Sequence, residues 1–155
     1  MIEIVKVETE KQLNAVRVLF LEYAAALGHD LGFQDFEKEL AGLPGRYAPP
    51  EGGLLLADSD GEPAGCAGLR RLEPGVCEMK RMYVRADFRS LRLGRRLAEA
   101  VLEEARRLGY RRMRLDTLVE MRAANRLYES LGFKDIPAYY HNPLPGARFM
   151  ELELG

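Results

Sequence analysis

The chain has 155 residues and a formal net charge of −1 at neutral pH, with 47% hydrophobic and 30% charged residues. This length predicts a single domain over residues 1–155, and the composition is that of an ordinary globular protein. The apolar runs are too short for a membrane-spanning helix and the acidic N-terminus lacks the basic flank of a secretory signal, so we expect a cytoplasmic protein with no membrane partner.

The near-neutral total hides a strong charge asymmetry. Residues 1–69 carry 5 Lys/Arg and 12 Asp/Glu, whereas residues 70–155 carry 18 Lys/Arg and 12 Asp/Glu. Arginine dominates the basic half, and its planar, multi-donor guanidinium suits phosphate and carboxylate groups. The second half therefore predicts an anionic ligand.

The first third of the chain predicts a strand and two helices. Residues 2–7 alternate as a strand does, and Gly28 offers a stop to the helix that follows. That helix is indicated by apolar residues at helical spacing: Leu13, Val16, Phe20, Tyr23 and Leu27. A short amphipathic piece within residues 32–50 predicts a second helix and a loop.

The middle of the chain predicts three consecutive strands. They cover residues 54–57, 63–72 and 76–84, and turn signals separate them at residues 58–61 and 73–75. Connections this short favour an antiparallel meander.

The last part returns to helical and strand patterns in alternation. A helix with a strongly apolar face starts near Leu93 and ends at Gly109. Residues 112–118 read as a buried strand, 123–131 as a helix and 148–154 as a final strand. The order predicts an α+β fold, with one mixed, mostly antiparallel sheet of about seven strands flanked by about four helices.

The two cysteines and the histidines give no sign of a metal site. Cys66 and Cys77 lie among apolar or small residues, form no CxxC pair and have no histidine nearby. We expect two buried free thiols and no metal cofactor.

The segment that carries the chemistry is a strand, a loop over residues 85–93 and the start of the long helix. The first turn of a helix has N–H donors without partners and a positive dipole end, so it binds a pyrophosphate well. Four arginines add charge there: Arg89, Arg92, Arg95 and Arg96. The residues alone fit equally a solvated helix face paired with Asp87 and Glu99.

Two motifs resemble those of the GNAT acetyltransferase superfamily, between about Gly65 and Phe133. The segment VRADFRSLRLGRRLAEAVLEEARRLGY resembles the acetyl-CoA motif, Arg or Gln, two residues, Gly, one residue, then Gly or Ala, with Arg89 first and Gly94 last. A second signature, A-x-x-L-Y-x-x-x-G-F, matches Ala124, Leu127, Tyr128, Leu131, Gly132 and Phe133.

The sequence departs from the family pattern at three positions. Arg92 stands where the middle glycine of the acetyl-CoA motif is usual, and Ser90 replaces another frequent glycine. Met121 stands where a pantetheine-binding asparagine is common, and Asn125 is not at that position. Arg92 places a side chain where the backbone of the motif normally approaches the phosphate closely.

The resemblance implies a GNAT-like fold with acetyl-CoA as the acetyl donor. The main chain of three strand residues would pair with pantetheine, with one backbone N–H polarising the thioester carbonyl: Met82, Tyr83 and Val84. The loop and helix start would hold the pyrophosphate: Arg89, Ser90, Leu91, Arg92, Leu93, Gly94 and Arg95.

Two residues are predicted to act in catalysis by this resemblance. Glu78 is the candidate general base that leaves the attacking amine neutral, directly or through water. The alternative for Glu78 is a charge at an exposed strand end, paired with Lys80 on the same face. Tyr128 matches the tyrosine that protonates the departing thiolate, and its alternative is plain core packing.

The acceptor is the least defined partner. The resemblance implies that the acceptor is a primary amine on a small molecule, amino acid or peptide, and that this amine attacks acetyl-CoA directly in a ternary complex. Residues 136–145 contain Tyr139, Tyr140, His141 and Asn142, and this segment either lines the acceptor pocket or is simply an aromatic-rich connection. Dimers are frequent in the family, which makes a homodimer compatible with it. A nucleic-acid-binding stripe is disfavoured by the acidic first half, whereas a non-catalytic acetyl-CoA sensor remains the main alternative.

Overall fold

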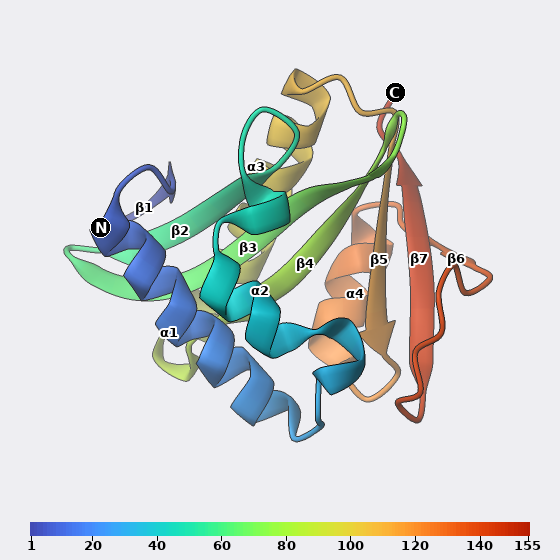
Figure 1. Ribbon diagram of the computed structural model, residues 1–155, viewed down its shortest axis with the longest axis horizontal. Coiled ribbons are helices and arrows are strands. Elements are labelled where there is room, and N and C mark those ends of the chain that lie inside the picture. The colour runs from blue at the N-terminus through green and yellow to red at the C-terminus, as the bar shows by residue number, and fades with distance from the viewer.

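The computed structural model describes residues 1–155, apart from the side chains of Phe33 and Ser90. Its elements follow the predicted order (Figure 1): β1 (Ile2–Lys6), α1 (Glu10–Leu27), α2 (Phe36–Gly42), β2 (Gly53–Ser59), β3 (Glu62–Glu73), β4 (Val76–Val84), α3 (Leu93–Arg107), β5 (Arg112–Leu118), α4 (Arg122–Ser130), β6 (Lys134–Ile136) and β7 (Ala147–Glu153). Short 3-10 turns lie at η1 (Gly32–Gln34), η2 (Gly45–Tyr47) and η3 (Ala86–Leu91). The predicted α+β fold is confirmed, and among its strands only the three-residue β6 had no predicted range.

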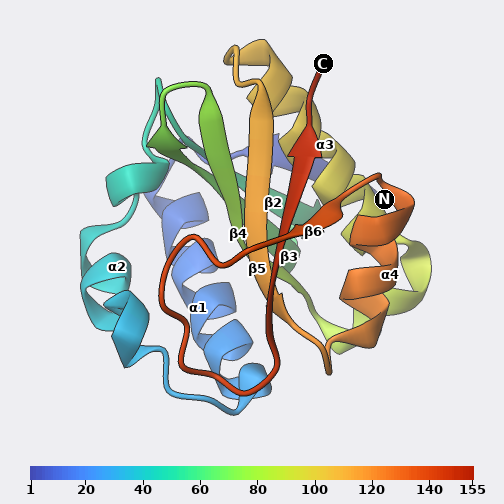
Figure 2. The same cartoon turned by 90° about the vertical axis from the view of Figure 1, so that its right-hand side faces the viewer.

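The strands form one sheet in the order β1-β2-β3-β4-β5-β7-β6. All neighbours are antiparallel except β4 and β5, which are parallel. Helices α1 and α2 cover one face and α3 and α4 cover the other, as two views at right angles show (Figures 1 and 2). Two apolar cores result, one under α1 around Val16 and Phe20, and one under α3 around Leu97 and Val101.

Local sequence explains where the long helices begin and end. Thr9 and Gln12 form a reciprocal capping box at the start of α1, and Gly28 ends it in the left-handed conformation with φ 72°. The predicted apolar stripe of α3 is fully buried at Leu93, Leu97 and Val101. Burial of this stripe fixes how α3 packs against β3 and β4.

A β-bulge at Arg81 splits the sheet between β4 and β5. Arg81 has φ 58°, and the β3–β4 register shifts between Cys66 and Gly68 opposite it. The β4–β5 ladder runs only from Val76 to Glu78 on the β4 side, after which the two strands diverge (Figure 1). The bulge therefore opens a gap through the sheet.

The bulge also shifts the alternation of β4 side chains between the two faces of the sheet. Before it, Cys77 and Met79 pack into the α3 core, and after it Met82 and Val84 do so. Tyr83 packs under α1 instead. The alternation of side chains along an extended strand has shifted by one residue.

Cys66 and Cys77 are buried free thiols, as predicted. Among the described residues, no helix is long and apolar enough to cross a bilayer.

The close packing of β3 on β4 makes Gly65 a sensitive position. A Cβ there would lie 2.7 Å from the Tyr83 carbonyl oxygen and 3.1 Å from Leu97 Cδ1. We expect Gly65→Ala to lower the free energy of unfolding by about 1–3 kcal/mol, measured by urea denaturation. Gly42→Ala, with nothing within 4 Å of its Cβ, is the control. Equal stability of the two variants would contradict the prediction.

Candidate functional site

The loop after β4 leads into a helix start with free main-chain donors. Among the side chains that the structure describes, none caps α3, which begins at Leu93, with one residue between it and the end of η3 at Leu91. The N–H groups of Leu93, Gly94 and Arg95 belong to the first turn and have no acceptor within the helix. Together with the positive end of the helix dipole, they form a site suited to a phosphate group.

Arg92 precedes α3 in the left-handed conformation, with φ 56° and ψ 27°. This is the position at which the acetyl-CoA motif usually has glycine, and glycine adopts this conformation without steric cost. Arg92 therefore reproduces the backbone that a glycine would give, at a cost of about 1 kcal/mol. Its side chain makes no hydrogen bond or ion pair to the described residues.

The neighbouring predicted loop residues have different environments. Leu93 is fully buried and anchors the helix start, whereas Leu91 is 53% exposed. Arg89 donates from Nε to the carbonyl oxygen of Val84 at 2.9 Å. The side chain of Ser90 lies outside the described residues, so its predicted contact stays a prediction.

Two further arginines flank the helix start. Arg95 donates to Ser130 Oγ at 3.0 Å and lies 3.6 Å from Glu99, one of the partners expected for a solvated helix face. Arg96 donates to the main-chain oxygen of Ile2 at 2.9 Å and so reaches toward β1. Through Ser130, Arg95 connects the start of α3 to the end of α4.

The second half of β4 has an open main-chain edge toward β5. Val84 and Tyr83 pair with Gly65 and Cys66 on the β3 side, but the ladder with β5 ends at Glu78. The peptide groups of residues 82–84 that face β5 thus have no strand partner, and among them the Val84 carbonyl oxygen accepts from Arg89 Nε. An extended ligand binds such an edge as an added strand. The structure brings this edge and the α3 start together at the end of one strand.

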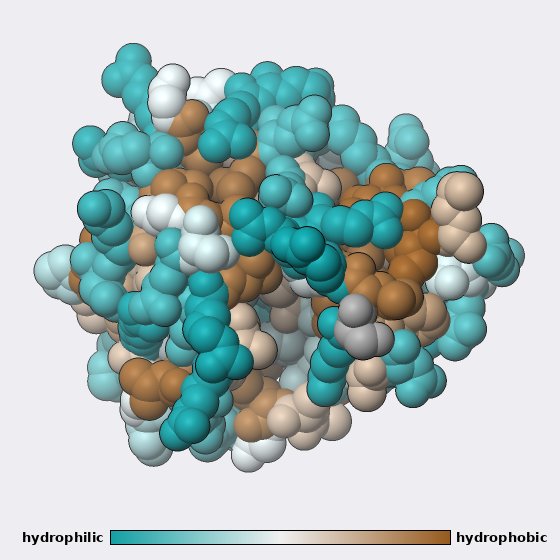
Figure 3. Space-filling view, turned by 180° about the vertical axis from the view of Figure 1, so that it is seen from behind, coloured by the Kyte–Doolittle hydropathy of each residue, from teal (hydrophilic) through white to brown (hydrophobic). Residues whose placement is uncertain are grey.

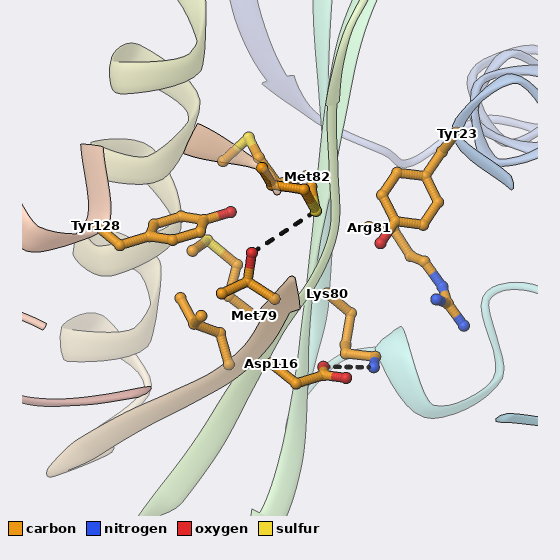
Figure 4. A pocket seen from close by; sticks show the side chains of 10 residues that line it. Tyr23, Met79, Lys80, Arg81, Met82, Asp116 and Tyr128 are labelled. Atoms are coloured by element: carbon orange, nitrogen blue, oxygen red, sulfur yellow. Dashed lines mark hydrogen bonds and ion pairs between the residues drawn. The ribbon is translucent and has the colours of Figure 1, made fainter. Parts of the chain in front are cut away.

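The gap between β4 and β5 is lined from both faces of the sheet (Figure 4). Tyr128 projects from α4 on one side and Tyr23 from α1 on the other, with their hydroxyl groups directed toward the gap. The free volume there is about 20 Å³. Side chains of both strands and of the α4 start complete the lining: Met79, Lys80, Arg81, Met82, Leu115, Asp116, Thr117 and Met121.

The α3/α4 face leads toward this gap. Seen from behind, the surface is hollowed near its centre between hydrophilic side chains (Figure 3).

Tyr128 is a buried tyrosine whose hydroxyl lies at the gap. The side chain is 5% exposed and packs edge-to-face on Phe133, with ring centroids 5.8 Å apart. Burial raises the pKa of its hydroxyl well above the ordinary value, so the hydroxyl holds its proton more tightly than an exposed tyrosine does. The hydroxyl makes no hydrogen bond to the described residues.

Glu78 is a buried carboxylate with two hydrogen-bond donors. Its side chain is 1% exposed, and it accepts from Arg70 Nε at 2.8 Å and from the Tyr139 hydroxyl at 2.5 Å. The alternative of an exposed charge paired with Lys80 is wrong, because Lys80 pairs with Asp116 instead. The burial of Glu78 follows from Tyr139, which the loop after β6 places over it.

A buried pair, Lys80 and Asp116, crosses the gap. Their side chains are 4% and 8% exposed, and Nζ lies 3.1 Å from Oδ1. Asp116 also accepts from the Tyr140 hydroxyl and from Asn142 Nδ2 at 3.0 Å. The loop 136–145 thus lies at the gap, while its His141 is exposed.

A second buried ion pair ties α2 to the bulge. Arg81 binds Glu39 with two hydrogen bonds of 2.9 Å and donates to Gln34 at 2.7 Å. Its guanidinium also lies over the rings of Phe36 and Tyr23. Desolvation opposes the charge, but Glu39 more than offsets it and raises the pKa of Arg81.

Asn125 and Met121 have distinct roles at the start of α4. Asn125 is buried, donates to the Leu118 carbonyl at 2.9 Å and accepts from Thr117, so it joins α4 to β5. Met121 lines the gap at the position where the family commonly has asparagine. A carboxamide is therefore absent from that part of the lining, and a thioether takes its place.

The sequence reasoning missed the Lys80–Asp116 and Arg81–Glu39 pairs. Both pairs join residues at least 36 positions apart in the sequence. Neither the periodicity of apolar residues nor a sequence motif indicates such pairs. The signal available in the sequence was the presence of charged residues inside β4 and β5, two strands whose other residues predict burial, because a buried charge requires a partner.

Comparisons with known proteins agree on one family. The Acetyltransferase (GNAT) family matches residues 13–133 of the chain. An uncharacterised N-acetyltransferase of Schizosaccharomyces pombe is 42% identical over 155 residues, covering 99% of this chain and 95% of its own length. Mouse N-acetylaspartate synthetase is 34% identical over 110 residues, covering 70% of this chain and 37% of that protein.

Solved structures show the same fold. A GNAT-family acetyltransferase from Staphylococcus aureus has a TM-score of 0.81 at 20% identity, with full coverage of both chains. The Salmonella typhimurium protein yncA, solved with its cofactor acetyl-CoA, has a TM-score of 0.74 at 22% identity and covers 100% of this chain and 95% of its own.

The strain at Arg92 can be measured with two variants that remove the same charged side chain. We expect Arg92→Gly to be more stable than Arg92→Ala by about 1 kcal/mol, because only alanine has a Cβ in the left-handed conformation. Urea denaturation of both variants at equal m-value provides the comparison. An alanine variant as stable as the glycine variant would show that the helix start does not require this conformation.

Proposed function

The chain belongs to the Acetyltransferase (GNAT) family, and from this we propose that it transfers the acetyl group of acetyl-CoA to a primary amine. The observation that carries the proposal is the gap between β4 and β5, which opens toward both faces of the sheet. One face offers a helix start suited to an anion, and the other offers the polar side chains of Tyr23, Lys80 and Asp116. Two substrates can therefore meet in the gap from opposite sides.

The α3/α4 side fits coenzyme A through main-chain groups. The free N–H groups of residues 93–95 suit the pyrophosphate, with Arg89, Arg92 and Arg95 beside them. The open edge of residues 82–84 suits the amide-bearing pantetheine arm, with one N–H aimed at the thioester oxygen. In this proposal the loop including Ser90 and Leu91 wraps the phosphates.

Direct attack in a ternary complex is favoured over an acyl-enzyme. Neither Cys66 nor Cys77 lines the gap, and burial raises the pKa of Cys77 to about 12. A thiol with such a pKa supplies almost no thiolate at neutral pH. The amine itself is then the nucleophile.

Glu78 accepts the amine proton in this mechanism, through the hydroxyl of Tyr139. The hydroxyl already donates to Glu78 at 2.5 Å, so a proton given to its oxygen passes along the same hydrogen bond. Arg70 holds the other carboxylate oxygen and keeps the acid group in place. Tyr128, directed into the gap from the opposite face, gives its proton to the departing thiolate.

Glu78→Gln tests the proton acceptor. The substitution keeps the size and one hydrogen-bonding oxygen but removes the charge that pairs with Arg70, so we expect a lower melting temperature and an unchanged coenzyme A affinity. The acetylation rate should fall on the order of 10²-fold at neutral pH and recover partly at high pH, where more amine is neutral. Glu103→Gln, on an exposed face of α3, is the matched control. A rate equal to that of the control would remove Glu78 from the mechanism.

Tyr128→Phe tests the proton donor. We expect at least about a tenfold loss of kcat, because the thiolate then leaves without general-acid help, while coenzyme A affinity stays constant. Tyr110→Phe, whose hydroxyl bonds the Glu51 carbonyl away from the gap, controls for loss of a phenol. An unchanged kcat would assign Tyr128 to core packing alone.

The main alternative keeps coenzyme A binding and drops catalysis. Departures from the family pattern at Arg92 and Met121 motivate it, since a family fold does not by itself prove turnover. Thiol release from acetyl-CoA, measured across a broad amine panel and paired with calorimetric titration of coenzyme A, separates the two. Binding without thiol release supports a sensor, and absence of binding rejects both.

A further inference from the structure

On the α1/α2 side, the gap continues into a chamber that contains the buried Lys80. The chamber shares Tyr23, Lys80 and Asp116 with the gap and is also lined by Leu27, Leu31 and Leu144. Its free volume is about 20 Å³, so a ligand larger than water requires these side chains to move apart. In the proposed function the coenzyme occupies the other face, so the acceptor approaches the thioester from this side and meets the polar groups of the chamber.

The carboxylates around this chamber are already saturated with donors. Besides Lys80, Tyr140 and Asn142, the carboxylate of Asp116 accepts a longer hydrogen bond of 3.4 Å from Gln34. Lys80 lowers the pKa of this carboxyl against the opposing effect of burial, so Asp116 stays ionised and paired.

Glu39 and Glu78 are held in the same way by other residues. Glu39 accepts from Arg81 and from the Tyr47 hydroxyl, and Glu78 accepts from Arg70 and Tyr139. These acids are thus poorly placed to bind the ammonium form of an acceptor.

Lys80, in contrast, has donors to spare. A charged amine carries three N–H groups, and Lys80 makes one hydrogen bond to the described residues, to Asp116, while its Nζ also lies 5.9 Å from the centroid of the Tyr140 ring. The residue is only 5% exposed, so N–H groups without an acceptor are costly. The hydroxyl of Tyr23 lines the same space and is directed toward the strand that carries Lys80 (Figure 4).

We propose that Lys80 and Tyr23 bind the carboxylate of the acceptor, which makes the natural substrate an α-amino acid. This rests on the proposed acetyl transfer. A carboxylate satisfies the spare donors with charge-assisted hydrogen bonds, and the amine one carbon away then lies toward the gap. The leucines that line the chamber suit an apolar side chain.

The substrate preference of the unmodified protein is the first test. Acetylation of L-leucine is compared with that of leucinamide and of 3-methylbutylamine, which keep the size and lack the carboxylate. We expect kcat/KM for leucine to exceed that for both analogues by about 10- to 100-fold. Equal or faster reaction of the analogues overturns the inference and leaves the acetyltransferase proposal standing.

Lys80→Met is the second test, because methionine keeps the unbranched shape and removes the donors. We expect KM for leucine to rise about 10- to 100-fold while kcat/KM for 3-methylbutylamine changes less than about threefold. Lys134→Met, on exposed β6, controls for loss of a lysine charge. If Lys80→Met fails to fold, the double variant with Asp116→Asn removes both charges of the pair and takes its place.

A third readout does not depend on turnover. Calorimetry of leucine binding to the protein saturated with coenzyme A should show binding that Lys80→Met and Tyr23→Phe weaken. Retained leucine preference in both variants would overturn the assignment of these two residues. Absence of thiol release with every amine, together with absence of coenzyme A binding, would reject the proposed function, and the inference with it.

Discussion

The β-bulge at Arg81 is the constraint on which the rest of the structure depends. A continuous β4–β5 ladder would pair every peptide group and leave no opening, whereas the bulge frees the main chain of residues 82–84. Unpaired main-chain groups and a left-handed arginine both cost free energy. The bidentate pair with Glu39 offsets part of that cost, because it fixes the Arg81 side chain between α2 and the sheet.

The same bulge gives the two faces different chemistry. On the α3 side it places Met82 and Val84 in the core, so the strand presents main chain rather than charge to the gap. On the α1 side it leaves Lys80 and Arg81 together, and their charges are matched by Asp116 and Glu39. One residue inserted into one strand thus separates a main-chain binding surface from a chamber of paired charges.

Whether an interaction could be predicted from the sequence depends on how far apart its residues lie along the chain. The stripe of α3, the capping of α1 and the turn signals between strands act over a few residues, so local patterns revealed them. The pairs at Lys80 and Arg81 depend on which strands and helices become neighbours, and the left-handed φ of Arg81 has no glycine to signal it. Glu78 was found through family resemblance, but its burial depends on Tyr139, 61 residues away.

The departures from the family motif become understandable when main-chain and side-chain contributions are separated. Arg92 takes the left-handed conformation that glycine would take, so the donors of the α3 start are unchanged. A site made from peptide groups tolerates many side chains, provided that the backbone path is kept. That independence agrees with a TM-score of 0.81 at only 20% identity to the Staphylococcus aureus structure. The chamber around Lys80 is made from side chains instead, so if acetyl acceptors bind there as proposed, differences in substrate between related chains arise there first.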